Sequence, residues 1–125
     1  EHIIRATLDS LGYQTKDVID AMQTDSGITL KSLRVDGGAV ANSVMMQFQA
    51  DMLGIPIIVP SVSQTTALGA AYAAGLAVGV WKDQEELRLL WSEKKRFTPD
   101  IDIKTRENLV SSWKKAVTKT FSWVD

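Results

Sequence analysis

The chain of 125 residues contains no cysteine and a single histidine, His2. Without cysteine, the sequence excludes a disulfide framework, a thiolate nucleophile and a metal site built on thiolates. One imidazole is too few for a histidine-based metal cluster, and it offers no secure position for a Ser-His-Asp triad. These absences remove several classes of enzyme before any motif is considered.

The sequence also lacks an excess of either charge. Its 14 lysines and arginines stand against 15 aspartates and glutamates, which gives a formal net charge of −1. We therefore expect neither nucleic acid nor an anionic membrane as a partner, because both attract a cationic surface. The length is typical of one domain, and a composition of 45% hydrophobic and 23% charged residues is ordinary for a globular protein.

Charge is absent from one long stretch. Residues 1–51 carry 11 charged side chains and residues 82–125 carry 18, but residues 52–81 carry none. Pro56 and Pro60 interrupt that stretch, and its helical part, about 65–80, is shorter than the roughly 20 residues that a transmembrane helix needs. We therefore expect a helix buried in a soluble core and no membrane span.

The first residues enter a helical pattern at once. Apolar side chains recur at three- and four-residue steps from Ile3 to Met22, as in a helix that buries one face. Because no turn or capping run precedes them, we interpret the chain as a piece of a longer polypeptide. An initiator methionine, a basic segment and an apolar signal core are all missing, so we expect no signal peptide and a cytoplasmic location.

Glycine and proline divide the chain into helices and strands. We expect a helix over 1–23 followed by a left-handed Gly27, a strand over 32–35, a helix over 40–53 that stops at Gly54, a strand over 55–59, a helix over 65–80 and an amphipathic helix from about 103. Strands that alternate with helices indicate an α/β fold with parallel pairing. Two strands rarely form a stable sheet, so we expect either partner strands outside this chain or a strand that the pattern hides.

The two parts of the chain have different expected roles. We expect residues 1–81 to form an αβαβα portion of one domain, and residues 82–125 to form a charged connection and the C-terminal helix of the same domain. We expect the charged run 93–96 to be solvated. We expect Trp91, Trp113 and Trp123 to anchor the C-terminal helix to the core.

The strongest chemical signal is the segment 35–42, with the sequence VDGGAVAN. A strand is expected to end here, two glycines to turn the chain and a helix to begin. The start of a helix offers unpaired N–H groups and a partial positive charge, which suit a phosphate, and glycine lets a nucleotide approach the backbone. Asn42 would lie one turn into the helix, within reach of such a ligand. The pattern alone favours a plain strand-to-helix turn capped by Asp36, because a Gly-Gly pair is a much weaker signal than a full phosphate-loop motif and lacks the GxGxxG spacing of a dinucleotide site.

Several segments of the chain resemble the FGGY family of carbohydrate kinases, whose members share the actin-like, ribonuclease H-like ATPase fold. These segments are 34–42 (RVDGGAVAN), 49–54 (QADMLG), 65–75 (TTALGAAYAAG) and 112–117 (SWKKAV), and the run 2–9 (HIIRATLD) is similar to the second half of a family signature. The resemblance covers essentially the whole chain. It identifies the chain as the C-terminal part of the family's second domain, an α/β fold that is incomplete as an isolated chain.

The resemblance implies an ATP or ADP site in which Gly38 and Asn42 contact the nucleotide and Gly37 and Ala39 shape the same turn, with the glycine pair against the adenosine end of the nucleotide. It places the general base, the groups that bind the sugar or polyol and the ligands of the accompanying Mg²⁺ upstream of this chain. It therefore implies no catalytic residue and no metal ligand here, and we expect the isolated chain to be inactive and either unstable or associated.

Within the family, segments 36–42 and 112–117 are more similar to the members that phosphorylate glycerol. They imply transfer of the γ-phosphoryl group of ATP to a primary hydroxyl of glycerol, with the rest of the kinase polypeptide as a partner and a homo-oligomer as the assembly. Two alternatives stay open. The chain is part of a sibling kinase that acts on a pentulose or another polyol, or it is a non-catalytic actin-like binding module.

Overall fold

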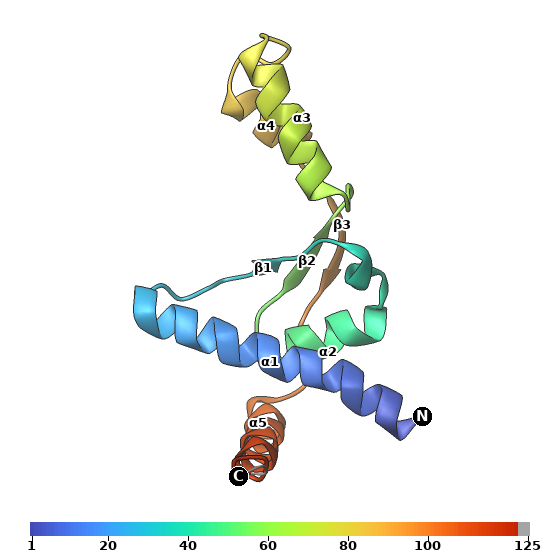
Figure 1. The fold of residues 1–125 in the computed structure, drawn as a ribbon, viewed down its shortest axis with the longest axis vertical. Helices are drawn as coiled ribbons and strands as arrows, with labels where there is room; N and C mark the ends of the chain where they lie inside the picture. Colours follow the sequence, from blue (N-terminus) through green and yellow to red (C-terminus); the bar gives the residue numbers. More distant parts are fainter. Residues whose placement is uncertain (123–125) are drawn as a thin grey trace.

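A computed structural model describes residues 1–122 and contains a small mixed sheet with helices on one side and at both ends (Figure 1). In chain order its elements are α1 (His2–Ser26), β1 (Leu33–Arg34), a short 3-10 helix η1 (Gly38–Ala41), α2 (Ser43–Leu53), β2 (Ile57–Pro60), α3 (Thr65–Ala77), α4 (Gln84–Leu90), β3 (Glu93–Phe97) and α5 (Ile103–Thr118). None of the helices in residues 1–122 has the length and apolar composition needed to cross a membrane.

The sheet has the strand order β1-β2-β3. β1 pairs with β2 in parallel, with Leu33 opposite Ile57, and β2 pairs with β3 in antiparallel, with Ile57 opposite Phe97. All four residues of β2 are buried. The prediction of a buried central strand at this point of the sequence is confirmed, and the predicted parallel pairing holds for β1 but not for β3.

β3 is the strand that the sequence pattern hides. Four of its five residues are exposed and charged, and only Phe97 is buried. Charged side chains are common on edge strands, because they oppose pairing with other chains. The run 93–96 is therefore exposed, as predicted, but it is also a strand. Of the two explanations for a sheet of only two predicted strands, an overlooked strand is correct within the described residues.

The predicted glycine stops of the helices agree with the structure, but the number of helices does not. α1 ends at Gly27, whose φ of 68° is left-handed, and α2 ends at Gly54 with φ 72°, so both stop signals are confirmed. α4 was not predicted. Its seven residues begin after Asp83, whose carboxylate accepts the Glu86 N–H (3.0 Å), and they lie in the connection that we expected to be irregular.

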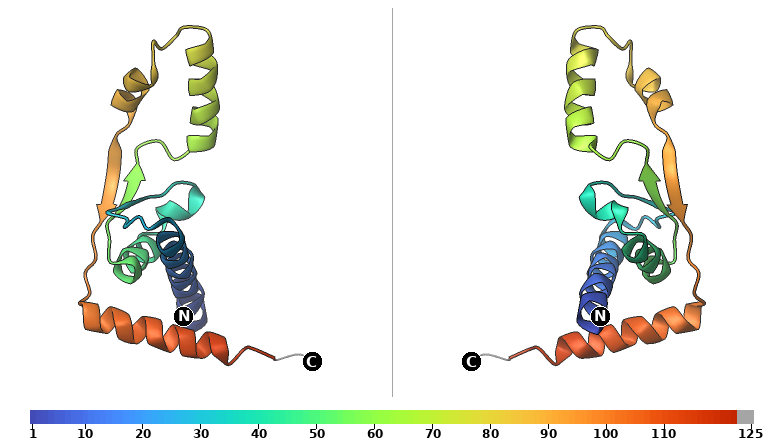
Figure 2. Two further views of the ribbon diagram at one scale, coloured as in Figure 1. Left: turned by 90° about the vertical axis from the view of Figure 1, so that its left-hand side faces the viewer. Right: turned by 90° about the vertical axis from the view of Figure 1, so that its right-hand side faces the viewer.

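α3 differs from the buried helix that the sequence predicted. Gly75 is its one buried residue in the described structure, and α3 and α4 extend away from the sheet (Figures 1 and 2). Gly75 is required for close packing, since a Cβ there would lie 2.1 Å from the Trp81 ring. Trp81 also meets Tyr72 edge to face, with ring centroids 5.2 Å apart. The expectation of a core helix is therefore wrong for this chain, because the described residues 1–122 leave every residue of α3 except Gly75 at least partly exposed.

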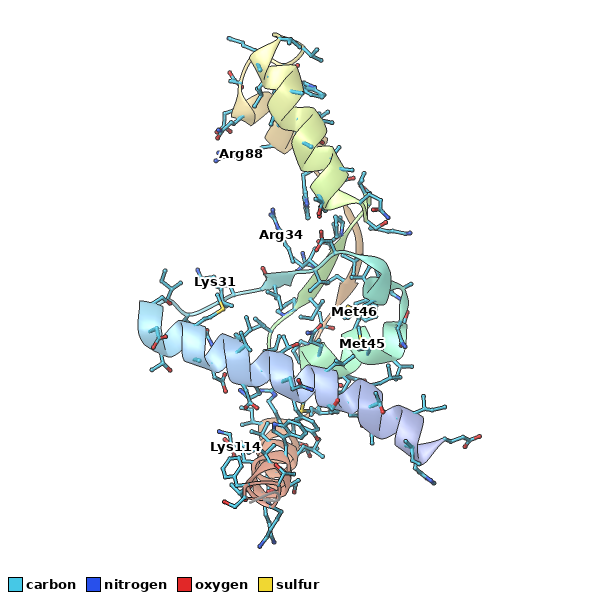
Figure 3. All side chains as sticks on the ribbon, viewed as in Figure 1. Lys31, Arg34, Met45, Met46, Arg88 and Lys114 are labelled. Atoms are coloured by element: carbon cyan, nitrogen blue, oxygen red, sulfur yellow. The ribbon has the colours of Figure 1, made fainter. Side chains whose placement is uncertain are left out.

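α2 is the central element of the fold and lies between α1 and the sheet (Figure 2). The buried core joins Met45, Met46 and Ala50 of α2 to the strands and Phe97, and Figure 3 labels the two methionines. Burying a methionine or isoleucine side chain fully contributes about 1.5–3 kcal/mol. The apolar face that α2 presents to the sheet therefore contributes to the stability of this fold.

α1 packs on the other side of α2 through a close approach at Gly12. A Cβ at Gly12 would lie 2.7 Å from the Phe48 ring, so only glycine fits without a shift of that ring. Tyr13 meets Phe48 edge to face, with centroids 5.2 Å apart, and stacks on Trp113 of α5 at 5.1 Å. The Trp113 Nε1–H donates to Asp17 Oδ2 (2.8 Å). Trp113 thus anchors α5 as predicted.

The other two tryptophans differ from that prediction. Trp91 follows α4 and contacts β1, where the Arg34 guanidinium lies 4.1 Å from the centroid of its ring. It therefore anchors the α4 end of the chain to the sheet and not the C-terminal helix, because the turn after α4 brings it to β1. Trp123 lies outside the described residues.

Asp51 of α2 holds the segment between β3 and α5. Its carboxylate is buried, and Oδ1 accepts the Asp100 N–H (2.8 Å) and the Gln47 side-chain amide (2.9 Å). The same Gln47 amide donates to the Thr98 carbonyl (2.8 Å). The Asp51 carbonyl accepts Arg106 Nε–H (2.5 Å), which satisfies a backbone acceptor in the last turn of α2. These contacts fix the direction in which the chain leaves the sheet.

Replacing Asp51 tests this contact directly. We expect Asp51→Ala to lower the free energy of unfolding by about 1–3 kcal/mol, because the Asp100 N–H and the Gln47 amide lose a buried acceptor. Asp51→Asn keeps an oxygen in the same place and is expected to cost less. Urea denaturation of the two variants and the unchanged protein measures both values, and equal losses for the two variants would contradict the role of the hydrogen bonds.

The start of α5 depends on Asp102. Its carboxylate accepts the Thr105 N–H (2.9 Å) and the Thr105 hydroxyl (2.6 Å). These hydrogen bonds lower the pKa of the Asp102 carboxyl below its ordinary value. A carboxyl with a lower pKa in the folded protein stabilises the fold above its unfolded pKa, and the contribution disappears as the pH falls through the folded pKa.

We therefore predict a pH-dependent advantage of aspartate over asparagine at position 102. Asp102→Asn keeps an uncharged acceptor, so the melting temperature of the unchanged protein should exceed that of the variant most clearly near neutral pH. The difference should shrink below about pH 4, where the carboxyl takes up a proton. Thermal melts at several pH values measure it, and a difference that stays constant into acid would contradict the assignment.

Candidate functional site

The glycine pair lies where β1 leaves the sheet. Gly37 has φ 88°, a left-handed value that residues with side chains rarely adopt, and its N–H points to the Ser63 carbonyl at 3.4 Å. Gly38 has no such restriction, but a Cβ built on it would meet no atom within 4 Å. The first glycine is therefore needed for the turn itself, and the second leaves open space in front of the backbone.

The helix after the turn begins later than the sequence predicted. Residues 38–41 form η1, and α2 starts at Ser43 because Asn42 is its N-cap. The Asn42 Oδ1 accepts the Met45 N–H at 3.1 Å, so Asn42 lies before the first helical turn and not one turn into it. The alternative in which Asp36 caps the helix is also wrong, since Asn42 provides the cap.

A cleft of about 440 Å³ opens at the carboxyl ends of the parallel strands β1 and β2. Ligands of open α/β sheets bind outside these carboxyl ends, where the loops converge. The cleft is lined by Gly37, Gly38, Val40, Ala41, Ser43, Val59, Pro60, Ser61, Ser63, Lys94 and Lys95. The lining contains two cations, three serines and exposed backbone, and no acidic residue among those named.

The four residues expected at a nucleotide site occupy different positions around this cleft. Gly37 and Gly38 line it. Ala39 and Asn42 belong to the same turn and are joined by a hydrogen bond from the Asn42 N–H to the Ala39 carbonyl (3.1 Å), but neither is among the residues of the described chain that line the cleft. All four residues thus lie in one turn, and two of them, Gly37 and Gly38, face the cleft.

The opposite wall of the cleft was not predicted from the sequence. Lys94 and Lys95 reach it because β3 pairs with β2, and Ser61 and Ser63 reach it because they directly follow β2. The charged run gave no local signal for a site, since the pairing partner lies more than 30 residues earlier in the chain. The hydrogen bond between Ser61 Oγ and Ser92 Oγ (2.6 Å) fixes these two strand ends together.

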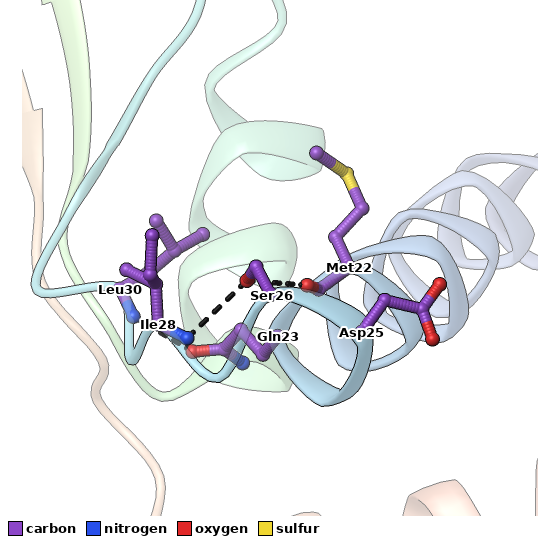
Figure 4. Close-up of a pocket in the computed structure, with 6 residues that line it drawn as sticks. All are labelled: Met22, Gln23, Asp25, Ser26, Ile28 and Leu30. Carbon is purple, nitrogen blue, oxygen red and sulfur yellow. Dashed lines mark hydrogen bonds between the residues drawn. The ribbon is translucent and has the colours of Figure 1, made fainter.

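A larger cavity, about 550 Å³, lies at the end of α1 (Figure 4). It is lined by Met22, Gln23, Asp25, Ser26, Ile28 and Leu30. Its polar groups close the helix end: Gln23 Oε1 accepts the Leu30 N–H (2.7 Å), and the Ser26 hydroxyl accepts the Ile28 N–H (3.2 Å) and donates to the Met22 carbonyl (2.6 Å). The cavity therefore has an apolar wall and polar groups engaged in local structure.

The ionisable groups outside the cleft do not form a second chemical site. Residues 1–122 contain no group of three or more His, Cys, Asp or Glu side chains placed to hold a metal ion. Burial and the nearby Asp9 raise the pKa of the Tyr13 hydroxyl above its ordinary value, and Arg5 opposes the shift. Tyr13 packs between α2 and α5, so this shift reflects packing of its ring rather than a place in the cleft.

Known proteins match the chain along almost its whole length. Residues 1–78 match the family model described as the C-terminal domain of the FGGY family of carbohydrate kinases. The glycerol kinase of Roseiflexus sp. is 60% identical over 124 residues, which are 99% of this chain and 25% of that protein. The glycerol kinase of Pseudothermotoga lettingae is 58% identical over 125 residues, again 25% of its length. The chain thus spans about a quarter of the length of the curated relatives it matches.

Solved structures share the fold. A crystal structure of Plasmodium falciparum glycerol kinase with ADP superposes with a TM-score of 0.86 at 37% identity, over 96% of this chain and 24% of that one. The ligand-bound xylulose kinase of Lactobacillus acidophilus gives a TM-score of 0.80 at 18% identity over the same shares, which shows the fold alone. The expected α/β fold of the kinase second domain is confirmed, and the chain belongs to the FGGY family of carbohydrate kinases as part of its C-terminal domain.

Proposed function

We propose that the chain is the adenine-nucleotide-binding part of an ATP-dependent glycerol kinase, which transfers the γ-phosphoryl group of ATP to a primary hydroxyl of glycerol. The observation that carries the proposal is the cleft beside Gly37 and Gly38, where backbone without side chains faces open space of about 440 Å³. The relatives named glycerol kinase support glycerol as the substrate, and the related structure with ADP supports an adenine nucleotide as the second ligand.

In this proposal the chain positions the nucleotide and takes no part in proton transfer. Phosphoryl transfer depends mainly on positioning the reactants and on stabilising charge. Gly38 and Asn42 contact the nucleotide, whose adenosine end lies against the glycine pair, and Gly37 and Ala39 shape the same turn. The general base and the groups that bind glycerol come from the rest of the polypeptide.

Three further features of the whole enzyme belong to the same proposal. Mg²⁺ accompanies the nucleotide, and its protein ligands come from elsewhere in the kinase. The enzyme acts in the cytoplasm as a homo-oligomer. The isolated 125-residue chain lacks the base and is inactive.

Gly38→Val tests the nucleotide site. We expect KM for ATP in the full-length kinase to rise at least about tenfold, because a branched side chain fills the space in front of the turn and removes about 1.4 kcal/mol or more of binding. KM for glycerol should change little. A Cβ at Gly38 would meet no atom of the described chain within 4 Å, and the melting temperature of the variant kinase distinguishes a weakened site from a folding defect.

Gly38→Ala is the matched control, since it adds a single methyl group at the same place. It should raise KM for ATP less than the valine variant does. An unchanged KM for ATP in both variants would remove Gly38 from the nucleotide site.

Asn42 has a structural role that must be separated from nucleotide binding. Asn42→Ala removes the cap of α2 and is expected to lower the free energy of unfolding by about 1 kcal/mol. Asn42→Ser keeps a capping oxygen but removes the amide group. If the amide contacts the nucleotide, both variants weaken ADP binding in calorimetry while Asn42→Ser keeps the melting temperature. Normal ADP affinity in Asn42→Ser would limit Asn42 to capping.

A further inference from the structure

The wall of the cleft opposite the glycine turn holds a fixed cation. Lys95 of β3 donates from Nζ to the Ser43 hydroxyl (2.9 Å), and Ser43 is the first residue of α2 and also lines the cleft. The same Nζ lies 4.5 Å from the centroid of the Phe97 ring, within the range of a cation–π contact. Phe97 is buried in the core. Two independent contacts therefore hold the ammonium group at the cleft.

The position of this cation is unfavourable without an anion. The N-terminus of a helix carries a partial positive charge, so a lysine beside Ser43 repels the start of α2. In residues 1–122 the ion pairs join Arg5 to Asp9, Lys16 to Asp20, Arg88 to Glu85 and Arg96 to Glu93, and none includes Lys94 or Lys95. The residues named in the lining include two lysines and no acidic residue, and neither lysine has a carboxylate oxygen of the described residues within 4 Å.

The size and chemistry of the cleft fit a phosphorylated ligand. Its volume of about 440 Å³ lies in the range of small-molecule sites. Charge-assisted hydrogen bonds from lysine to phosphate are about twice as strong as neutral ones. An anionic group placed in the cleft would meet Lys95, the hydroxyls of Ser43, Ser61 and Ser63, and the start of α2.

Resting on the proposed function, we propose that Lys95 is a further nucleotide-binding residue that contacts the phosphate groups, while the glycine turn meets the adenosine end. Ser43 and Phe97 position its ammonium group, and Lys94 adds positive charge to the same wall. The antiparallel pairing of β3 with β2 therefore has a function in addition to completing the sheet.

The test compares ADP with adenosine in the full-length kinase by calorimetry. For Lys95→Gln we expect Kd for ADP to rise about five- to twentyfold, as for loss of a partly exposed hydrogen bond to a charged group. Kd for adenosine should stay unchanged, since adenosine carries no phosphate. Lys95→Arg keeps the charge and should retain most of the ADP affinity. The weakening of ADP binding by added salt should be smaller in Lys95→Gln.

Lys104→Gln is the matched control, because Lys104 is an exposed lysine on α5 that does not line the cleft. It should change neither affinity. Equal weakening of ADP and adenosine by Lys95→Gln, or no weakening of ADP, would overturn the role of Lys95. That outcome leaves the proposed function standing, provided that Gly38→Val still weakens adenosine binding. If the full-length kinase without substitutions binds neither ADP nor adenosine, the proposed function itself is overturned.

Discussion

The buried carboxylate of Asp51 joins segments that local interactions alone would not keep together. From α2 it accepts the N–H of Asp100, 49 residues later in the chain, and its backbone carbonyl accepts the guanidinium of Arg106. These contacts determine where the chain leaves β3 and where α5 begins. Since β3 carries Lys94 and Lys95, one wall of the cleft depends on a hydrogen bond made at the opposite end of α2.

Both ends of α2 therefore position neighbouring segments of the chain. At its start, Asn42 accepts the Met45 N–H and places the 3-10 turn of Gly38 beside the cleft. At its end, Gly54 adopts a left-handed conformation and Arg106 satisfies a terminal carbonyl. Between them, its methionines fill the core against β2. One helix thus connects the stability of the fold with the geometry of the glycine turn.

The outer elements of the chain present apolar surface that a complete α/β domain normally covers. Ile3 and Ile4 of α1 are 83% and 69% exposed, and Leu89 of α4 is 85% exposed. α3, with its small residues, extends away from the sheet (Figure 1). These exposures fit the observation that the chain spans about a quarter of the length of its relatives. They also explain why a helix that the sequence predicted to be buried is exposed here.

The sequence by itself determined the elements whose signals are local. Glycine stops at 27 and 54, the apolar run of β2 and the strand–turn–helix segment at Gly37 and Gly38 were all predictable, because capping, alternation and backbone freedom act over a few residues. Tertiary structure decided what depends on distant partners. β3 forms because β2 offers it an edge, Asn42 becomes a cap because η1 precedes α2, and Lys95 reaches the cleft because β3 pairs with β2. Pairing and burial across the chain leave no local pattern, so only the folded chain shows them.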